Sequence, residues 1–287
     1  MAPEVRDLVD SLEPLALLAV TWAHTGGRSG GLEIENQYLD VRILDPSGRF
    51  VGVASIHKPA PSMSQHAAAA ATATLGHLER MRLVERPDRR PAAILIADLE
   101  ASAPLAKRLS TAQFFAFGRR LVRAGDQCII DQGGVVGRHS GDGVTAFFLA
   151  ETCGSESVAA RSCIAASRAL RDALPQVAAR CDLDEVDVSL RFGLHWGWTL
   201  YVGRILTAGR SEVTALGDEV NETARIQECA TGARSLASKS LIERLAGADP
   251  ESLGIDTSHM TYTPLAELAT ATDKARRDAP SIAVCEV

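Results

Sequence analysis

Two side chains with phosphate-binding chemistry, Asn221 and Arg225, lie four residues apart near the start of an expected helix. The β-type run at residues 212–216 is followed by Gly217 and by Asp218, a favourable N-cap residue. Residues four apart share one helix face, so an amide and a guanidinium would project beside the exposed N–H groups of the helix N-terminus. This arrangement suits a phosphate or a charged transition state. An ordinary capped helix with a solvated polar face fits the same residues equally well.

Two aspartates lie where expected strands end. The continuous apolar run at residues 92–97 is typical of a strand buried on both faces, and it stops at Asp98. A carboxylate in this position is placed for metal binding or catalysis, and capping of the next helix is the alternative role. Asp142 lies in a tight Ser-Gly-Asp-Gly turn at residues 140–143. Aspartates are common in turns, so this position alone does not indicate a function.

The elements around these residues predict an α+β fold, with one mainly antiparallel sheet of the ferredoxin-like or palm type and helices packed on it. Helices are expected at residues 111–131, 157–174 and 236–245 and from residue 218 onward. Strands are expected at residues 133–138, 144–149, 186–195, 198–204, 212–216 and 280–284. The strands at 186–195 and 198–204 should form a hairpin, and 280–284 should be an edge strand. His139 is expected on a strand face, and His195 and Trp196 in the sheet and core.

The chain divides into three parts. Residues 1–62 form a small N-terminal α/β module, which is compatible with a sensor of the PAS type and equally with a structural cap. Residues 63–91 form a helical linker with an Ala-rich helix at 65–84. Residues 92–287 form the larger domain. Within the N-terminal module we expect a helix at 5–12 and strands at 17–22, 38–44 and 50–56, the last two joined by an Asp-Pro-Ser-Gly turn at 45–48.

The composition excludes several classes of function. The net charge is −6 and the sequence has no block of lysines or arginines, so it lacks the basic footprint of a nucleic-acid-binding protein. Six cysteines without a Cys-x-x-Cys pair indicate reduced thiols. The apolar stretch at residues 15–23 is too short to span a bilayer, and the acidic residues before it do not fit a signal peptide. We therefore expect a soluble, cytoplasmic protein without membrane insertion or a nucleic-acid partner.

Three segments of the larger domain together resemble the catalytic domain of class III nucleotidyl cyclases, the adenylyl and guanylyl cyclases. Ile-Ala-Asp-Leu around Asp98 resembles the family's first metal-binding strand end, and Gly-Asp-Gly around Asp142 resembles its second metal-binding hairpin. Residues 216–225, which contain Asn221 and Arg225, resemble its Gly-x-x-Val-Asn-x-x-x-Arg helix. Each segment alone is a weak signal, but all three occur in the family's order on the expected elements.

The resemblance implies a reaction and a metal cofactor. A nucleotide's 3′-hydroxyl would attack its own α-phosphate, and pyrophosphate would leave. Asp98 and Asp142 would hold two Mg²⁺ or Mn²⁺ ions, one to lower the pKa of the hydroxyl and one to neutralise the polyphosphate. Arg225 would stabilise the charge on the transferring phosphorus centre, and Asn221 would orient the ribose.

The resemblance also implies further substrate contacts and a partner. Lys274 falls near a family lysine that contacts the terminal phosphates, and the backbone from Leu99 to Ser102 would cradle the triphosphate. In this family the site lies between two catalytic domains, one of which supplies the carboxylates and the other the base-reading residues, the Asn and the Arg. This chain carries each set once, so the resemblance implies a homodimer with two equivalent sites.

The positions that read the base depart from the usual pattern. Adenylyl members typically carry a lysine four residues before the second metal aspartate and an aspartate seven residues before the Asn, where this chain has Arg138 and Thr214. Thr at the second position resembles one bacterial adenylyl subgroup, whereas guanylyl members typically carry Glu and Cys. Because a guanidinium does not replace an ammonium neutrally, Arg138 is the larger departure. We expect an adenylate cyclase that converts ATP to cyclic AMP; the alternatives are a guanylate cyclase and a cyclase-like domain that binds nucleotide without turnover.

Overall fold

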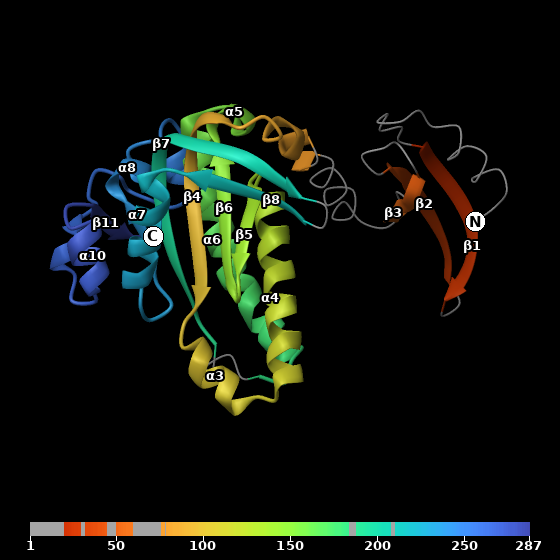
Figure 1. Ribbon diagram of the computed structural model, residues 1–287, viewed down its shortest axis with the longest axis horizontal. Coiled ribbons are helices and arrows are strands. Elements are labelled where there is room, and N and C mark those ends of the chain that lie inside the picture. The colour runs from red at the N-terminus through yellow and green to blue at the C-terminus, as the bar shows by residue number, and fades with distance from the viewer. Residues whose placement is uncertain are drawn as a thin grey trace. The chain divides into compact units, whose positions relative to one another are not determined.

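The computed structural model describes residues 20–29, 32–44, 50–59, 76–77, 79–183, 188–207 and 210–287. The chain divides into a first unit, residues 1–72, and a second unit, residues 73–287 (Figure 1). The helix expected at 5–12 and the turn expected at 45–48 lie outside the described residues, and the expected domain boundaries stay predictions. Among the described residues, no helix is both long and apolar enough to cross a membrane.

The first unit contains a three-stranded antiparallel sheet in the order β1-β2-β3. Tyr38 of β2 lies opposite His57 of β3, so the strands expected at 38–44 and 50–56 pair with each other. The strand expected at 17–22 corresponds to β1, which is described from Val20 onward. The three strands are β1 (Val20–Ser29), β2 (Leu32–Leu44) and β3 (Phe50–Pro59). Whether this unit is a PAS-type sensor or a structural cap stays a prediction.

The second unit is a mainly antiparallel sheet with helices packed on it, as the sequence predicts. Its strands follow the order β10-β11-β9-β7-β4-β6-β5, with β8 paired to β7; β7 and β9 run parallel. The strands are β4 (Asp88–Leu99), β5 (Val135–Ser140), β6 (Gly143–Leu149), β7 (Leu190–Thr207), β8 (Arg210–Leu216), β9 (Ser235–Ser238), β10 (Thr263–Pro264) and β11 (Ala283–Glu286). The helices are α3 (Ser102–Arg108), α4 (Thr111–Asp131), α5 (Ala150–Cys153), α6 (Glu156–Ala179), α7 (Asp218–Cys229), α8 (Lys239–Ile242), α9 (Asp249–Ser252), α10 (Asp273–Asp278) and the 3-10 turn η2 (Leu265–Glu267).

Two long helices, α4 and α6, cover one face of this sheet (Figure 1). A capping box starts α4, because Ser110 Oγ accepts from the backbone N–H of Gln113 while Gln113 Oε1 accepts from the backbone N–H of Ser110. The buried residues Phe117, Leu121, Gly125 and Ile129 recur every fourth position and therefore form one helix face. That face closes the main core.

Side chains of β4 alternate between the two faces of the sheet. Leu95 and Leu99 join the core under α4 and α6, whereas Ala92 and Ile94 join a second core on the other face, against which Val220 of α7 packs. By the same alternation, the Asp98 side chain lies on the face that carries α7. The metal-binding carboxylate expected from the sequence thus points away from the long helices.

The structure corrects the hairpin expected at 186–195 and 198–204. Among the described residues, 190–207 form the single strand β7, which pairs with β4 from Leu190 opposite Leu99 to Val202 opposite Asp88. Pairing along the central strand β4 keeps the backbone extended through Gly193 and Gly197. The hairpin partner of β7 is instead β8, with Tyr201 opposite Leu216.

Two other expectations near the C-terminus are also wrong in detail. The helix expected at 236–245 begins only at Lys239, because Ser235–Ser238 form the buried strand β9 beside Phe192 and Leu194 of β7. The strand expected at 280–284 is β11, Ala283–Glu286, and it lies between β10 and β9 instead of at the edge. In both cases pairing with a distant strand overrides the local pattern.

Gly193 lets α7 lie directly on the backbone of β7. A Cβ atom at this position would lie 2.5 Å from the Gln227 nitrogen and 2.5 Å from the Thr223 carbonyl oxygen. Both are helix backbone atoms, so a side chain cannot be accommodated unless α7 moves away from the sheet. Gly193 therefore determines how closely the helix that carries Asn221 and Arg225 packs on the sheet.

We expect Gly193→Ala to destabilise the second unit by about 1–3 kcal/mol, because it overpacks a rigid contact. The free energy of unfolding in urea, followed by circular dichroism, measures this change. Gly118→Ala is the matched control: nothing lies within 4 Å of a Cβ built at Gly118 in α4, and the gain in helix propensity is about 0.5–1 kcal/mol. Equal effects of the two substitutions would contradict the packing argument.

Candidate functional site

The helix α7 carries the first group of expected site residues. It begins at Asp218, and its N-cap is Gly217 without a side-chain cap bond, so the expected N-cap role of Asp218 is wrong. Asp218 and Glu219 instead occupy the first turn, where the helix dipole favours acidic side chains. The strand β8 ends at Leu216, directly before the start of this helix.

Asn221 and Arg225 line one pocket at the side of α7, as their spacing predicts. The pocket has a volume of about 490 Å³ and is also lined by Asp218, Glu222, Asp278 and Ala279. Asp278 lies at the end of α10, so two helices distant in the sequence form the walls. An amide and a guanidinium at one pocket can bind a phosphate-containing ligand.

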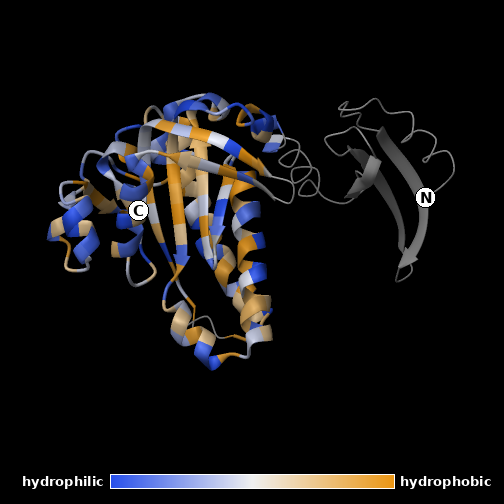
Figure 2. Ribbon diagram, viewed as in Figure 1, coloured by the Kyte–Doolittle hydropathy of each residue, from blue (hydrophilic) through white to orange (hydrophobic). Residues whose placement is uncertain are grey.

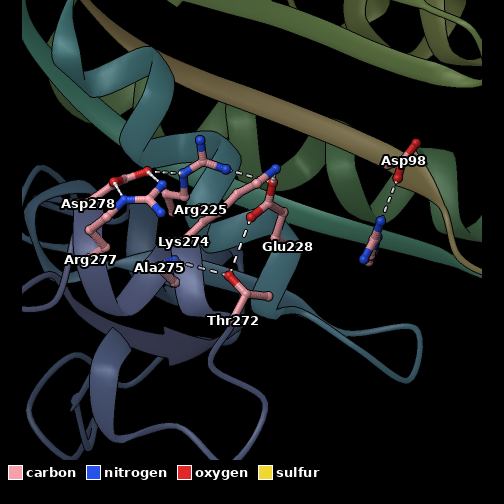
Figure 3. A network of polar contacts seen from close by, with 9 residues as sticks. Asp98, Arg225, Glu228, Thr272, Lys274, Ala275, Arg277 and Asp278 are labelled. Carbon is pink, nitrogen blue, oxygen red and sulfur yellow. Dashed lines mark hydrogen bonds and ion pairs between the residues drawn. The ribbon is translucent and has the colours of Figure 1, made fainter.

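Arg225 is held by two carboxylates (Figure 3). Its Nη1 lies 2.6 Å from Glu228 Oε1, and its Nε lies 3.1 Å from Asp278 Oδ2. Lys274, on α10, lies with its Nζ 3.7 Å from the same oxygen of Glu228. The structure therefore brings Lys274 next to the helix of Arg225, although the two residues are distant in the sequence. The carboxylates of Glu228 and Asp278 are site components that the sequence analysis did not identify.

Asp98 and Asp142 come to the same end of the sheet. Ala97 of β4 pairs with Val144 of β6, so the next residue along β4, Asp98, lies beside the β5–β6 turn that carries Asp142. The Oδ2 atom of Asp142 is buried without a hydrogen-bond partner. Among the described residues, no group of three or more His, Cys, Asp or Glu side chains could hold a metal ion. The two carboxylates expected to bind metal thus lie close together, and their role as ligands stays a prediction.

Arg191 of β7 accompanies Asp98 and was not identified from the sequence. Its Nη2 lies 2.7 Å from Asp98 Oδ2, and the two residues are register partners across β4 and β7. Alternation along the strand places Arg191 on the face of Gly193, but its pairing with Asp98 depends on a register that no local pattern reveals. In Figure 3 the Asp98 pair stands apart from the Arg225 network, and no interaction connects the two.

The segment from Leu99 to Ser102 joins β4 to α3. The Leu99 side chain is buried in the core, Ala101 adopts a left-handed conformation with φ of 56°, and Ser102 begins α3. Between them, the Glu100 carboxylate accepts hydrogen bonds from the backbone N–H groups of Gly232 and Ala233. Although burial raises the pKa of Glu100, these bonds hold that pKa below its ordinary value. Glu100 thus fixes the turn expected to cradle a triphosphate.

Arg138 and Thr214, the expected base-reading residues, lie on β5 and β8, two strands that contact each other without pairing. Arg138 on β5 is 65% exposed, and its Nε lies 3.9 Å from Glu212 Oε1 on β8. Thr214 is two residues from Glu212 and therefore on the same face of β8. Arg138, His139 and Glu212 also line a pocket of about 360 Å³. The two positions thus lie near one surface.

His195 and Trp196 lie in the sheet and core, as expected. His195 and Trp196 are buried. The Nε2 atom of His195 lies 2.9 Å from Glu222 Oε2, and this hydrogen bond lowers the pKa of Glu222. The contact ties α7 to β7 one residue after Asn221.

Comparison with known proteins relates the chain to a fold. No protein-family model and no curated protein sequence matches it. Among solved structures, the adenylyl cyclase CyaB from P. aeruginosa is similar, with a TM-score of 0.55, 15% identity and coverage of 70% of this chain and 96% of that one. The guanylyl cyclase Cya2 is similar with a TM-score of 0.56, 20% identity and coverage of 70% and 93%. The guanylate cyclase domain of RhGC from Catenaria anguillulae, solved with GTP, has a TM-score of 0.51, 15% identity and coverage of 69% and 96%. The chain therefore has the fold of adenylyl and guanylyl cyclase catalytic domains.

His139, beside Arg138, yields a prediction about pH. The hydrogen bond with Asp126, 2.7 Å away, raises the pKa of His139 above its usual 6.5 despite partial burial. A raised pKa means that protonated His139 stabilises the fold; this stabilisation is fully present below pH 6.5 and is lost as the pH rises through the folded-state pKa. We expect Asp126→Asn to destabilise the protein by about 0.2–1 kcal/mol below pH 6.5, and by less at pH 8.5.

Urea unfolding at pH 5.5 and 8.5 measures both values. In a His139→Gln background, Asp126→Asn should change the free energy of unfolding by the same amount at both pH values. An Asp126→Asn effect that is equal at both pH values, or larger at pH 8.5, would contradict the assignment.

Proposed function

We propose that this protein is a nucleotidyl cyclase that converts ATP to 3′,5′-cyclic AMP and pyrophosphate at a site shared between two copies of the chain. The observation that carries the proposal is the convergence of Asp98 and Asp142 at one end of the sheet, with one oxygen of Asp142 buried and unsatisfied. A buried carboxylate oxygen without a donor is costly, and a cation would offset that cost. The cyclase fold and the Asn221–Arg225 pocket support the same function.

The residues fit a divalent cation of the Mg²⁺ or Mn²⁺ type, since carboxylate oxygens are the ligands that these hard cations prefer. Asp98 and Asp142 would hold two such ions. When bound, the ions lower the pKa of the ribose 3′-hydroxyl and neutralise charge on the polyphosphate. Arg191 keeps the Asp98 carboxylate oriented toward the α7 face of the sheet and offsets its charge before an ion arrives.

The remaining residues bind and orient the nucleotide. Arg225 donates to the α-phosphate as negative charge develops on it, and Asn221 orients the ribose from the same helix face. Lys274 binds the terminal phosphates through its exposed ammonium group. In the backbone from Leu99 to Ser102, the N–H groups of Ala101 and Ser102 would donate to the triphosphate, because that of Glu100 already donates to the Ser189 carbonyl. The Glu100 carboxylate holds this turn in place.

The base would be read by Arg138 and Thr214. The Arg138 guanidinium donates to an acceptor on the purine, and Thr214 donates or accepts through its hydroxyl. Two features keep GTP as the second candidate substrate: arginine replaces the lysine usual in adenylyl members, and solved guanylyl cyclases share the fold. ATP remains the proposal because neither the Glu nor the Cys of guanylyl members is present.

A second copy of the chain would complete the site. The apolar side chains of Tyr201, Ile205 and Leu216 are exposed on one face of the β7–β8 hairpin, because Tyr201 lies opposite Leu216 and Ile205 is four residues further along β7. Apolar residues on these two strands are visible in Figure 2. An isologous contact through this surface would bury these side chains and bring the carboxylates of one copy toward α7 of its partner.

The first prediction of this proposal concerns turnover. Purified protein with Mn²⁺ and ATP should form cyclic AMP, identified by chromatography and mass spectrometry, and Asp98→Ala should abolish product formation. Arg225→Ala should lower kcat by about 10²–10³-fold, the usual effect of removing a preorganised donor to a transition state.

The same assay with GTP decides the substrate, and faster ATP turnover by Arg138→Lys would show that this position reads the base. Product formation that is equal in wild type and Asp98→Ala would refute the cyclase assignment and leave nucleotide binding without turnover.

The second prediction concerns assembly. Ile205→Glu combined with Leu216→Glu should shift the sedimentation coefficient from dimer toward monomer and lower specific activity, with recovery at higher protein concentration. Phe115→Glu is the matched control, because Phe115 is as exposed as Leu216 but lies on α4. If the control and the double variant behave alike, the β7–β8 surface is not the contact.

A further inference from the structure

We infer that Asp278 and Glu228 are positioning residues that hold the Arg225 guanidinium in the orientation needed for phosphate chemistry. This inference rests on the proposed function and extends it to two residues that no motif identifies. Asp278 reaches Arg225 from α10, 53 positions along the chain, and Glu228 reaches it from the next turn of α7. The two carboxylates contact different nitrogens of the guanidinium.

The contacts leave one edge of Arg225 for a ligand. A guanidinium has five N–H donors in a planar fork. Asp278 takes the donor on Nε and Glu228 takes a donor on Nη1, whereas none of the contacts between described residues engages Nη2. In Figure 3 the third nitrogen points away from both carboxylates. Because Arg225 and Asn221 line the same pocket, a phosphate there can meet the free edge without displacing either carboxylate.

Asp278 is itself held in place. Arg277 donates from Nε to Asp278 Oδ1 at 2.8 Å and from Nη2 to Asp278 Oδ2 at 3.2 Å. The Arg277 contact keeps the pKa of Asp278 below its ordinary value, so the carboxylate is ionised at neutral pH. The charge of Arg277 also offsets the negative charge that Asp278 brings to the pocket.

Glu228 links the two cations expected on the phosphates. Its Oε1 lies 2.6 Å from Arg225 Nη1 and 3.7 Å from Lys274 Nζ, and its Oε2 accepts from Thr272 at the start of α10. One carboxylate therefore sets the spacing between the guanidinium and the ammonium group. That spacing suits two phosphates of one polyphosphate chain.

The burial of Arg225 distinguishes carboxylates that orient its guanidinium from carboxylates that a bound nucleotide would displace. If the carboxylates merely neutralised Arg225 until a nucleotide displaced them, its side chain would have to swing out on binding. The Arg225 side chain is only 18% exposed and is bonded at two nitrogens, whereas Lys274 is 59% exposed and in looser contact. Arg225 is thus the fixed group and Lys274 the movable one. Losing Asp278 should therefore lower the rate of the chemical step more than it weakens substrate binding.

The test is a double-mutant cycle on the intact chain with Mn²⁺ and ATP. Asp278→Asn should lower kcat by about 10- to 100-fold, the scale expected when a catalytic group is misplaced, with KM changed by less than about 3-fold. In an Arg225→Ala background the same substitution should have no further effect, because Asp278 acts only through Arg225. Asp273→Asn, which changes an exposed aspartate at the other end of α10, is the control and should leave kcat unchanged.

Three kinetic outcomes overturn the inference: a normal kcat in Asp278→Asn, an increased kcat, or an equal loss with and without Arg225. A second readout does not need turnover. In protein labelled with ¹⁵N-arginine, the Arg225 Nε–H signal, assigned with Arg225→Lys, should shift or broaden in Asp278→Asn and stay unchanged in Asp273→Asn. Addition of Mg²⁺ and inorganic triphosphate should also perturb that signal.

If wild-type protein shows no turnover that depends on Asp98, the cyclase proposal fails and the NMR experiment alone decides the positioning role. An Arg225 signal that is indifferent to Asp278→Asn overturns it.

Discussion

The close contact between α7 and the backbone of β7 at Gly193 is the constraint on which the site depends. The atoms of Thr223 and Gln227 that face Gly193 belong to the helix backbone, so the helix cannot rotate or lift without breaking a tight interface. Asn221 and Arg225 belong to the same helix, so the position of the helix fixes where their side chains begin. The hydrogen bond between His195 and Glu222 adds a second attachment one turn before Arg225. A side chain that stabilises charge developing in a transition state must be held in place beforehand, and this rigid packing of α7 provides that.

Most of the charged groups expected to act on a nucleotide are paired within the chain. Asp98 is paired with Arg191, Arg225 with two carboxylates, and Arg138 lies near Glu212. The partly buried pairs of Asp98 and Arg225 restrict the conformations of their side chains before a ligand binds, and removing one partner of such a pair would leave an uncompensated charge. Asp142 differs, because one of its oxygens is buried without a donor. Under the proposed function, a cation at the β5–β6 turn would supply the missing partner.

Several elements were predictable from local pattern, and the exceptions share one cause. The helix at 111–131 follows from its capping residue and four-residue apolar spacing, and α4 has the same bounds. The strands that flank Asp142 follow from alternation and a turn signal. The hairpin expected at 186–195 and 198–204 and the helix expected at 236–245 were wrong because strands distant in the sequence pair there. In β7, the close approach of α7 requires a glycine at position 193.

The sequence by itself determined which side chains could do chemistry: Asp98 and Asp142 at strand ends, and Asn221 and Arg225 one turn apart on a helix. Spacing along a helix or strand sets which residues share a face, and that information is local. Only the tertiary structure decided what these groups touch. Arg191 meets Asp98 through the register of β4 and β7, and Asp278 meets Arg225 through the packing of α10 on α7. Ion pairs of this kind depend on separations in space between residues far apart in the chain, and no periodicity in the sequence encodes those separations.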